Sequence, residues 1–296
     1  MCGICGQVSF TTDLSKYESQ FYNMQNKLYS RGPDRHGEFF SQNAVLMHRR
    51  LAVVDIEKGN QPMTYAVDGA VFTLCYNGEL YNTNEIRNTL ESRGYNFFSH
   101  SDTEVVLKAY VEYREKCVDM FNGIFAFAVW EHETRRLFVA RDRMGVKPLF
   151  YSMTKSGFVF ASEIKALLEH SEIEPVIDTR SLAEIMIIGP GRTPGCGVFK
   201  GISEIRPAHY AYYDETGLTI HRYWNVEAHE HSESFEQTAE KVRYLVTDSI
   251  KRQLVSDVPL CTFLSGGLDS SLISSVTNGE FKKSGEVLHT FSVDYK

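Results

Sequence analysis

The stretch IFAFAVW at 124–130 restricts the possible folds more than any other part of the chain. All seven residues are apolar, whereas a strand with one face in water alternates apolar and polar side chains. The stretches RRLFVARD, PLFYSM and FVFASE follow after short turns, and strands joined by tight turns pair antiparallel. An antiparallel strand that is covered on both faces requires stacked layers, for example sheet on sheet with helices outside.

Composition describes an ordinary globular chain and argues against several classes of protein. The 296 residues are 43% hydrophobic and 23% charged, a length for about two domains. A net charge of -7 without a basic run argues against nucleic-acid binding. No apolar run approaches the roughly 20 residues of a membrane span, and the N-terminus lacks the pattern of a secretory signal. The six cysteines are sparse and irregularly spaced, which predicts a reduced, cytoplasmic protein.

Apolar periodicity and turn residues predict two domains. In the first, helices are expected over 15–29, 84–93 and 103–113, and strands at the starts of GICGQVSF, AVLMHRRLAVVD and GAVFTLCYNGELYN. Glycine and proline cluster over 188–207, so we expect a domain over 1–190 and a linker and bridging segment over 191–234. A long amphipathic helix from about 234 to 254 opens a second domain, 235–296. The strand, helix and strand that follow are typical of a parallel α/β unit.

The first residues, MCGICG, raise the question of a catalytic cysteine. Met1 precedes a small residue, so we expect its removal, which would leave Cys2 with a thiol and a free α-amine. A terminal amine has a pKa near ~8 and could accept the thiol proton, which makes one residue both nucleophile and base. The alternative is an inert, frayed terminus. A redox pair or zinc site with Cys5 is disfavoured because no second Cys-x-x-Cys exists, and Cys5 is expected to be a small core residue.

Three further stretches place polar groups at the ends of strands or helices. Arg49 and Arg50 end a strand, where an arginine could hold a carboxylate through two parallel hydrogen bonds or form a surface ion pair. The Asn77 amide and the Gly78 N–H could stabilise an oxyanion, although Asn-Gly is also a routine turn. Asp102 precedes a helix, where it could hold a substrate ammonium or simply cap the helix.

The ordered motifs MCGICG, RGPD, HRRLAVVD, YNGELYN, SDTEVV, FNGIFAFAVW and ARDRMGVKPLFY resemble the glutaminase domain of class II glutamine amidotransferases over about residues 2–190. These enzymes are N-terminal-nucleophile hydrolases, so the resemblance implies an α+β fold, a four-layer αββα sandwich. It implies Cys2 as nucleophile, and Asn77 with the Gly78 N–H as oxyanion hole. Arg50 would hold the glutamine α-carboxylate and Asp102 the α-ammonium. The implied glutamine site consists of Arg50, Leu51, Ala52, Val53, Val54, Asn77, Gly78, Glu79 and Asp102.

The stretch PLCTFLSGGLDSSLISSV predicts a strand, a glycine-rich turn and a helix, which together can cradle an anion. It lacks the Gly-Lys-Ser/Thr that closes a P-loop. LSGGLDSS resembles the pyrophosphate loop of ATP-pyrophosphatase-type enzymes, which adenylate a carboxylate or similar group. The resemblance implies that Asp269 reaches the pyrophosphate through Mg²⁺ and that Leu264 and Val293 flank the adenine. The implied pyrophosphate loop is Ser265, Gly266, Gly267, Leu268, Asp269, Ser270 and Ser271.

The two halves together resemble the glutamine-hydrolysing asparagine synthetases. This resemblance implies that ammonia released at Cys2 passes, shielded from solvent, to an aspartate that ATP has activated as aspartyl-AMP, and that asparagine, AMP and pyrophosphate result. Glutamine, aspartate and ATP would be the substrates, and a homodimer is possible. Only one helix and one strand follow the loop, so we expect a truncated synthetase that retains the glutaminase half and makes no asparagine.

Four alternatives are considered beside this interpretation. A phosphoribosylpyrophosphate amidotransferase and a glucosamine-phosphate synthase share the first half but have no SGGLDSS loop. A β-lactam-forming synthetase shares both halves, and an intact Cys2 argues against it. A non-catalytic interaction module derived from the family is the alternative outside enzymes. The mass of the mature N-terminus separates that alternative from the enzyme, because a retained Met1 favours the module.

Overall fold

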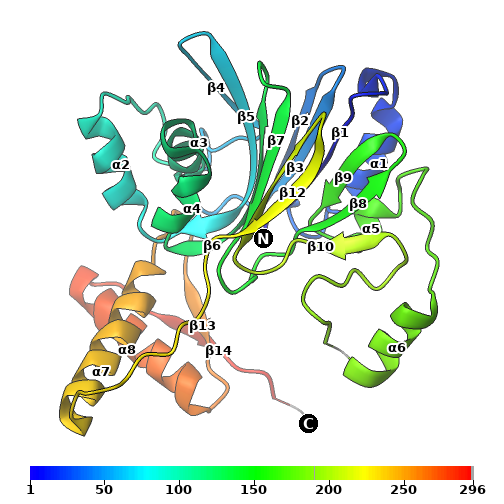
Figure 1. Ribbon diagram of the computed structural model, residues 1–296. Coiled ribbons are helices and arrows are strands. Elements are labelled where there is room, and N and C mark those ends of the chain that lie inside the picture. Colours follow the sequence, from blue (N-terminus) through cyan, green and yellow to red (C-terminus); the bar gives the residue numbers. More distant parts are fainter. Residues whose placement is uncertain (190, 295–296) are drawn as a thin grey trace. The chain divides into compact units, whose positions relative to one another are not determined.

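The computed structural model describes residues 1–189 and 191–294, and it divides after Asn225 into two compact units (Figure 1). The first unit contains two six-stranded sheets in which every strand pair is antiparallel. The sequence-based prediction of an α+β fold with antiparallel strands is therefore confirmed. One sheet has the order β10-β8-β9-β1-β3-β2, and the other has the order β12-β11-β7-β6-β5-β4.

The first sheet consists of β1 (Gly3–Val8), β2 (Arg35–Phe40), β3 (Ala44–Arg50), β8 (Phe150–Thr154), β9 (Gly157–Ala161) and β10 (Ile202–Glu204). The second sheet consists of β4 (Met63–Val67), β5 (Ala70–Leu80), β6 (Gly123–Glu131), β7 (Arg136–Arg141), β11 (His209–Asp214) and β12 (Gly217–Arg222). Expected strands within 44–55, 69–82, 124–131, 135–142, 148–153 and 158–163 all occur. Strands β2 and β4 were not expected from the sequence.

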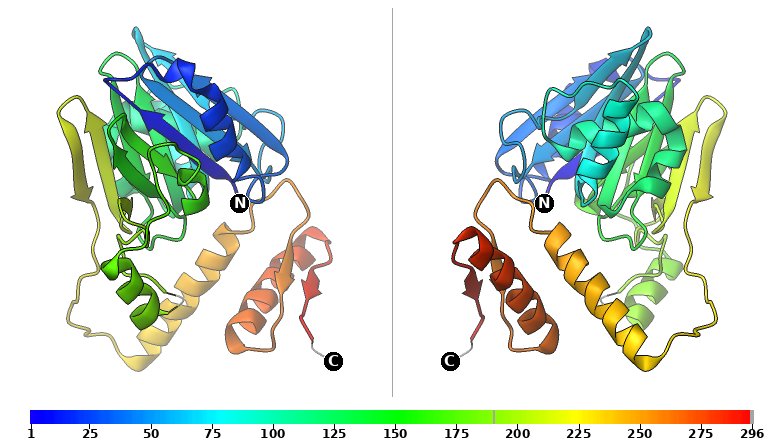
Figure 2. Two further views of the ribbon diagram at one scale, coloured as in Figure 1. Left: turned by 90° about the vertical axis from the view of Figure 1, so that its right-hand side faces the viewer. Right: turned by 90° about the vertical axis from the view of Figure 1, so that its left-hand side faces the viewer.

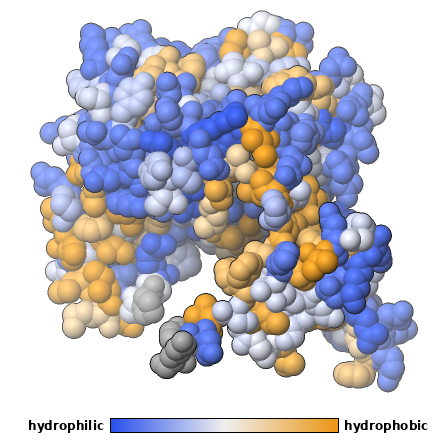
Figure 3. All heavy atoms as spheres, turned by 180° about the vertical axis from the view of Figure 1, so that it is seen from behind, coloured by the Kyte–Doolittle hydropathy of each residue, from blue (hydrophilic) through white to orange (hydrophobic). Residues whose placement is uncertain are grey.

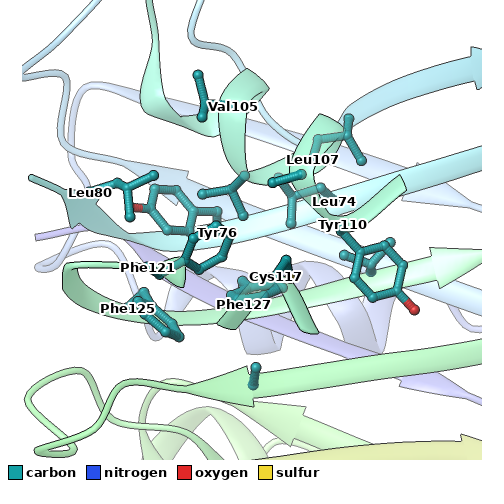
Figure 4. Packing of buried hydrophobic residues seen from close by; sticks show 14 of the residues in the cluster. Leu74, Tyr76, Leu80, Val105, Leu107, Tyr110, Cys117, Phe121, Phe125 and Phe127 are labelled. Atoms are coloured by element: carbon teal, nitrogen blue, oxygen red, sulfur yellow. The ribbon is translucent and has the colours of Figure 1, made fainter. Parts of the chain in front are cut away.

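Strand β6 lies inside its sheet between β5 and β7, and both of its faces are covered. Phe125, Phe127 and Val129 join one buried cluster, whereas Ala126 and Trp130 join another. The first cluster packs against α2 (Thr83–Ser92), α3 (Asp102–Tyr113) and α4 (Cys117–Met120), and Figure 4 shows part of it. The second cluster contains side chains from both sheets. The apolar run at 124–130 therefore has the double cover that the sequence predicts.

A third buried cluster lies on the other face of the β1-containing sheet. It includes Phe21 and Met24 of α1 (Glu18–Asn26) and Ala166 and Leu167 of α5 (Ile164–Leu167). Figure 2 shows α1 on one side of the paired sheets and α2 and α3 on the opposite side. Helices, sheet, sheet and helices thus follow one another, and the apolar clusters lie between them.

Most expected helices occur within one or two residues of the expected bounds, but 15–29 is not one continuous helix. A 3₁₀ helix, η1 (Leu14–Lys16), comes first, and α1 begins after Tyr17. A second 3₁₀ helix, η2 (Arg114–Lys116), connects α3 to α4. The helices α5 and α6 (Thr179–Ile188) were not expected.

The first compact unit extends beyond the expected boundary at 190. Where the sequence suggests a linker over 191–234, β10 pairs with β8, and β11 pairs with both β7 and β12. Pro207 lies in the connection between β10 and β11, and Gly217 opens β12 with a positive φ of 118°, so these residues do not mark a domain boundary. Before this segment, α6 carries exposed apolar side chains, including Met186 and Ile187, which gather as an orange area at the lower left of Figure 3.

The second unit contains α7 (Phe235–Arg252), β13 (Cys261–Phe263), α8 (Leu268–Ser284) and β14 (His289–Phe291). β13 and β14 pair in parallel, with Cys261 opposite His289. Ser234 caps α7 through a capping box with Gln237. None of the helices in 1–189 and 191–294 combines the length and apolar content of a membrane span. All six cysteines are free thiols.

Candidate active site

A pocket in the first unit brings together residues that lie far apart in the sequence. The N-terminus, the segment after β3, the C-terminal part of β5 and the start of α3 all contribute to its walls. Nine of its lining residues were singled out from the sequence. The full lining is Met1, Cys2, Arg50, Leu51, Val53, Val54, Gly59, Gln61, Tyr76, Asn77, Gly78, Glu79, Ser101, Asp102, Thr103 and Lys147.

Cys2 is held just before β1, at the wall of the pocket. Its Sγ lies 3.7 Å from the carbonyl oxygen of Leu51. Its own carbonyl oxygen accepts a 2.8 Å hydrogen bond from Nε of Arg31, which also pairs with Glu163 at 3.1 Å. Burial raises the pKa of the Cys2 thiol above its ordinary value. At neutral pH the thiol is therefore protonated, and a base has to remove its proton before it can act as a nucleophile.

Asn77 and Gly78 lie inside β5, opposite Ala126 and Phe125 of β6. Asn77 is buried, and its Nδ2 has no hydrogen-bond partner among the described residues. A buried donor without an acceptor costs about 1–3 kcal/mol, so such a group calls for an explanation. At Gly78, a Cβ atom would approach the Tyr76 ring to 2.6 Å, so this position has no room for a side chain.

Arg50 is 4% exposed and donates into the segment that follows it. Its Nη2 donates to the carbonyls of Val54 (3.0 Å) and Asp55 (2.6 Å). Its Nη1 donates to the carbonyl of Ile56 (2.9 Å) and to Oδ1 of Asn60 (3.3 Å). Both terminal nitrogens are thus engaged twice, and the arginine organises the loop over 51–60.

Arg49 and Ala52 do not contribute to the lining of the pocket. Nε of Arg49 donates to the carbonyl of Gln25 in α1 at 3.4 Å, because neighbouring strand residues point to opposite faces. The N–H of Ala52 donates to Oδ2 of Asp34 at 2.8 Å, which fixes the backbone of the loop. Leu51, Val53 and Val54 do line the pocket.

Asp102 is the first residue of α3 and does not cap the helix, contrary to the simple interpretation of its position. Ser101 is the N-cap and accepts the Thr103 N–H at 3.1 Å. Oδ2 of Asp102 accepts hydrogen bonds from the Tyr76 hydroxyl (2.9 Å) and the Leu80 N–H (3.1 Å). Burial raises the pKa of Asp102, and a cation beside it would favour the ionised carboxylate.

Lys147 lines the same pocket and was missed in the sequence analysis. It is 3% exposed, and burial lowers the pKa of its ammonium group, whereas Glu79 and Cys2 oppose that shift. It belongs to ARDRMGVKPLFY, where a lysine directly before a proline and an apolar strand could have suggested a buried position. The 2.6 Å hydrogen bond from Nε of Arg141 to its carbonyl holds this turn.

The expected nucleotide loop lies in the second unit, between β13 and α8. Gly266 has a positive φ of 82°, and α8 begins after Gly267, which offers no side-chain cap. The Ser270 hydroxyl accepts the Ser265 N–H at 3.2 Å. Leu268 and Val293 are exposed. Within the described residues no group of three or more His, Cys, Asp or Glu side chains could hold a metal ion.

The first unit thus combines two six-stranded antiparallel sheets with a pocket that is lined by both Cys2 and the buried Asn77. Residues 1–224 match the glutamine amidotransferase domain family, and residues 241–296 match asparagine synthase. The chain therefore belongs to the glutamine amidotransferase domain family.

Individual relatives are similar to this chain in sequence, and one solved structure is similar to it in fold. Asparagine synthetase [glutamine-hydrolyzing] 3 of Bacillus subtilis is 52% identical, with 100% of this chain and 48% of that protein covered. Asparagine synthetase B of Escherichia coli is 34% identical, with 94% and 45% covered. The chain thus spans about half the length of these relatives. The glutamine phosphoribosylpyrophosphate amidotransferase of B. subtilis matches in fold, with a TM-score of 0.50, 16% identity, and 98% of this chain and 65% of that chain covered.

Proposed function

We propose that this chain hydrolyses glutamine to glutamate and ammonia, with Cys2 as the nucleophile. The observation that supports this most is Nδ2 of Asn77, a buried donor that lies in the same pocket as Cys2 and has no partner within 1–189 and 191–294. An oxyanion that develops on a substrate amide would accept from it, and a preorganised donor of this kind stabilises the transition state. The N–H of Gly78 would be the second donor. The backbone N–H of Asp142 donates to the carbonyl of Phe125, and the Asp142 carboxylate accepts the Phe125 N–H. Both backbone groups of Phe125, the residue opposite Gly78, are thus bonded to Asp142, which supports a Gly78 N–H that is directed at the substrate.

The proposed nucleophile requires a base, because burial raises the pKa of its thiol. Removal of Met1 would supply one, the α-amine of Cys2. Met1 also lines the pocket, so its removal would enlarge the space for substrate. The amine takes the thiol proton while sulfur bonds to the amide carbon, and the oxyanion collapses with cleavage of the C–N bond. The protonated amine gives this proton to the amide nitrogen as the C–N bond breaks, so that the nitrogen leaves as ammonia. Water hydrolyses the resulting thioester and releases glutamate and Cys2.

The α-groups of glutamine would bind on the opposite side of the pocket from Cys2. Asp102 would accept from the α-ammonium, and Arg50 would donate to the α-carboxylate. Both terminal nitrogens of Arg50 already donate to the loop over 51–60, so the carboxylate would take the place of some of these acceptors. The backbone from Leu51 to Val54 and the side chain of Glu79 would complete the site.

The first unit would accordingly have the four-layer αββα sandwich of N-terminal-nucleophile hydrolases, and the order of its helices and sheets supports this. The second unit would begin a parallel α/β nucleotide-binding domain, which the parallel pair β13 and β14 supports. We extend the glutaminase domain to about Asn225, because β10, β11 and β12 belong to its sheets.

We further infer that the complete protein is a synthetase in which ATP activates aspartate and ammonia amidates it. The residues Leu264 to Ser271 and Val293 would bind ATP, with the uncapped start of α8 facing the phosphates. A single carboxylate, Asp269, fits a Mg²⁺ that is held mainly by phosphate oxygens, which is how Mg²⁺ usually binds nucleotides. Bound Mg²⁺ would neutralise phosphate charge.

The test of the glutaminase combines two measurements on the purified chain. Mass spectrometry of the N-terminus should show that Met1 is absent, and L-glutamine should be converted to glutamate and ammonia. Cys2→Ala should abolish turnover and leave the far-UV circular dichroism unchanged, whereas Cys261→Ala, at an exposed cysteine of the second unit, should retain it. Residual turnover of Cys2→Ala above a few per cent would place the nucleophile elsewhere. For the full-length protein, aspartate should drive pyrophosphate release from ATP more strongly than other amino acids do.

A further inference from the structure

Asp55 ends the motif HRRLAVVD and has no assigned role, yet its environment is unusual. Its side chain is 3% exposed, and its backbone has a φ of 49°. That left-handed conformation is uncommon for a residue with a side chain, although aspartate tolerates it better than most. A buried carboxylate in a strained turn persists only where the surroundings hold it firmly.

The backbone carbonyl of Asp55 shapes the loop that contains Arg50. It accepts Nη2 of Arg50 at 2.6 Å and the N–H of Gly59 at 3.0 Å. At Gly59 a Cβ atom would lie 2.4 Å from Nη2 of Arg50, so only glycine leaves room for this guanidinium. The turn at Asp55 thus sets where Arg50 lies along the pocket wall.

The carboxylate of Asp55 reaches a second segment, 45 residues further along the chain. Oδ1 accepts the N–H of Lys58 at 3.0 Å within its own loop. Oδ2 accepts the N–H of His100 at 2.8 Å, and Nδ1 of His100 lies 3.3 Å away. Burial by itself would raise the pKa of Asp55, but these hydrogen bonds lower it below its ordinary value. The carboxylate is therefore ionised at neutral pH, and bonds to it are charge-assisted.

His100 is two residues before Asp102, and this segment is fixed at its other end. Glu104 in α3 accepts the N–H of Ser99 at 2.9 Å and its hydroxyl at 2.6 Å. The ammonium of Lys58 adds a further link by donating to the carbonyl of Phe98 at 3.2 Å. Asp55 therefore joins the turn that carries Arg50 to the segment that leads into Asp102.

We propose that Asp55 is a positioning residue, whose carboxylate fixes the spacing between Arg50 and Asp102 and so selects substrates with both an α-carboxylate and an α-ammonium. The inference rests on the proposed glutaminase function. Two anchors held at a fixed spacing bind a substrate with both groups far better than a substrate with one, because the second contact costs little further ordering. Asp55 does not line the pocket, so it would not contact the substrate amide that Cys2 attacks.

The test is Asp55→Asn, which keeps the shape of the side chain but turns one of its two acceptors into a donor. In either orientation an NH₂ group faces a backbone N–H, so one of the two links is lost. The KM for L-glutamine should rise about 10-fold, while kcat changes less than about 3-fold. Glutaramic acid lacks the α-ammonium and 4-aminobutanamide lacks the α-carboxylate. The preference for L-glutamine over each, measured as the ratio of kcat/KM values, should fall about 10-fold.

Asp68→Asn is the matched control, because Asp68 has the same positive φ (50°) but is exposed in the turn between β4 and β5. It should behave as wild type. The rate at which iodoacetamide alkylates Cys2 should not differ between Asp55→Asn and wild type, since iodoacetamide has no α-groups to position. If Asp55→Asn does not fold, Lys58→Met is measured instead and should raise the KM about 3-fold.

The positioning role would be overturned if wild type is active and Asp55→Asn shows an unchanged KM and an unchanged substrate preference. Equal losses of kcat and of Cys2 alkylation would overturn it as well, because they would indicate general damage to the pocket. A wild-type protein that hydrolyses no glutamine would contradict the proposed function itself.

Discussion

The two units differ in how their candidate sites are supported. Every buried hydrophobic side chain in the described residues lies at or before Tyr213. Among the described residues of the second unit, 226–294, only Ser274 and Thr277 are buried, while Phe235 and Leu268 are 82% and 91% exposed. Cys2, Asn77 and Arg50 are thus held by packed sheets and buried hydrogen bonds. The loop over 264–271 is held mainly by local hydrogen bonds among its serines. Small substitutions at the first site should therefore have large effects on activity and stability, and those in the loop over 264–271 should have small effects.

The sharpest test of this difference uses two glycines. At Gly78 a Cβ would lie 2.6 Å from Tyr76 and 2.7 Å from the carbonyl of Ile124, whereas at Gly267 the nearest atom, Oγ of Ser265, is 3.6 Å away. Gly78→Ala should lower glutaminase kcat on the order of 10²-fold by displacing the oxyanion donor, and should lower the melting temperature. Gly267→Ala should change neither. Wild-type kinetics in Gly78→Ala would show that this strand is more compliant than its packing indicates.

Arg50→Lys tests the geometry of the same site. Lysine keeps the charge but lacks the planar fork, so it can replace neither the four bonds to the loop nor a paired contact with a carboxylate. The free energy of glutamine binding should weaken by about 1.5–3 kcal/mol, measured as a rise in KM. The adjacent Arg49→Lys, on the other face of β3, should leave KM near wild type. An unchanged KM in Arg50→Lys would exclude Arg50 as the carboxylate anchor.

Limited proteolysis compares the two units directly. Exposed backbone with few buried apolar contacts opens more readily and is cleaved first. Trypsin should remove residues after about Asn225 at least about 10-fold faster than it cleaves within 1–225, as followed by mass spectrometry of the fragments. Glutaminase activity should survive the first cleavage. Early cuts within 1–189 would contradict the comparison.

Lys147→Met tests a buried charge in the first unit against an exposed one in the second. Loss of the cation beside Cys2 should lower kcat by about 10-fold, because negative charge that develops at the nucleophile would lose a stabilising partner. Stability should hold or rise slightly, since the desolvation cost of a buried ammonium disappears. Lys282→Met, at an exposed position of α8, should alter neither quantity. A wild-type kcat in Lys147→Met would assign the lysine to the pocket wall alone.

The smallest expected effect concerns pH. Burial lowers the pKa of His48 to about 3, and its Nε2 lies 3.2 Å from the carbonyl of Tyr76. Below pH 6.5 the unfolded chain binds a proton here that the folded chain does not, so stability falls as pH falls. Between pH 6.5 and 5.5 this residue should cost about 1 kcal/mol of unfolding free energy. Urea titrations should show a shallower pH dependence for His48→Gln, whereas His229→Gln should match wild type.

The strands around the site could be predicted from the sequence because their apolar runs are long and their turns are short. The double cover of 124–130 followed from its seven consecutive apolar residues and the short turns that come after it. The segment 191–234 was expected to be a linker because glycines and prolines cluster near its start. These residues occur in turns as well as in linkers, and sequence pattern does not separate the two cases. The alternating side chains of β11 and the glycine that opens β12 were the available signals for the hairpin.

The site itself was only partly predictable. Cys2, Asn77 and Gly78 could be predicted as site residues, because a thiol is suited to act as a nucleophile and an Asn-Gly pair offers two donors for an oxyanion. The engagement of Arg50 with its own loop depends on the conformation of that loop, and the link from Asp55 to His100 joins segments 45 residues apart. Sequence pattern encodes neither. Lys147 was missed because a lysine is usually exposed, and only the fold shows that this one is buried.

Side chains alternate between the two faces of β5, which makes this strand sensitive to the insertion or deletion of a single codon. Tyr76 packs into the helix-covered cluster, while Cys75 belongs to the cluster between the sheets, and Asn77 follows the parity of Cys75. Inserting or deleting one codon between Val71 and Tyr76 would exchange these faces unless a bulge absorbed the change. A random library of single-residue insertions should therefore contain few active clones with changes in this strand. Insertions in the turn at Asp68 and Gly69, which lies outside the paired segment, should be tolerated far more often.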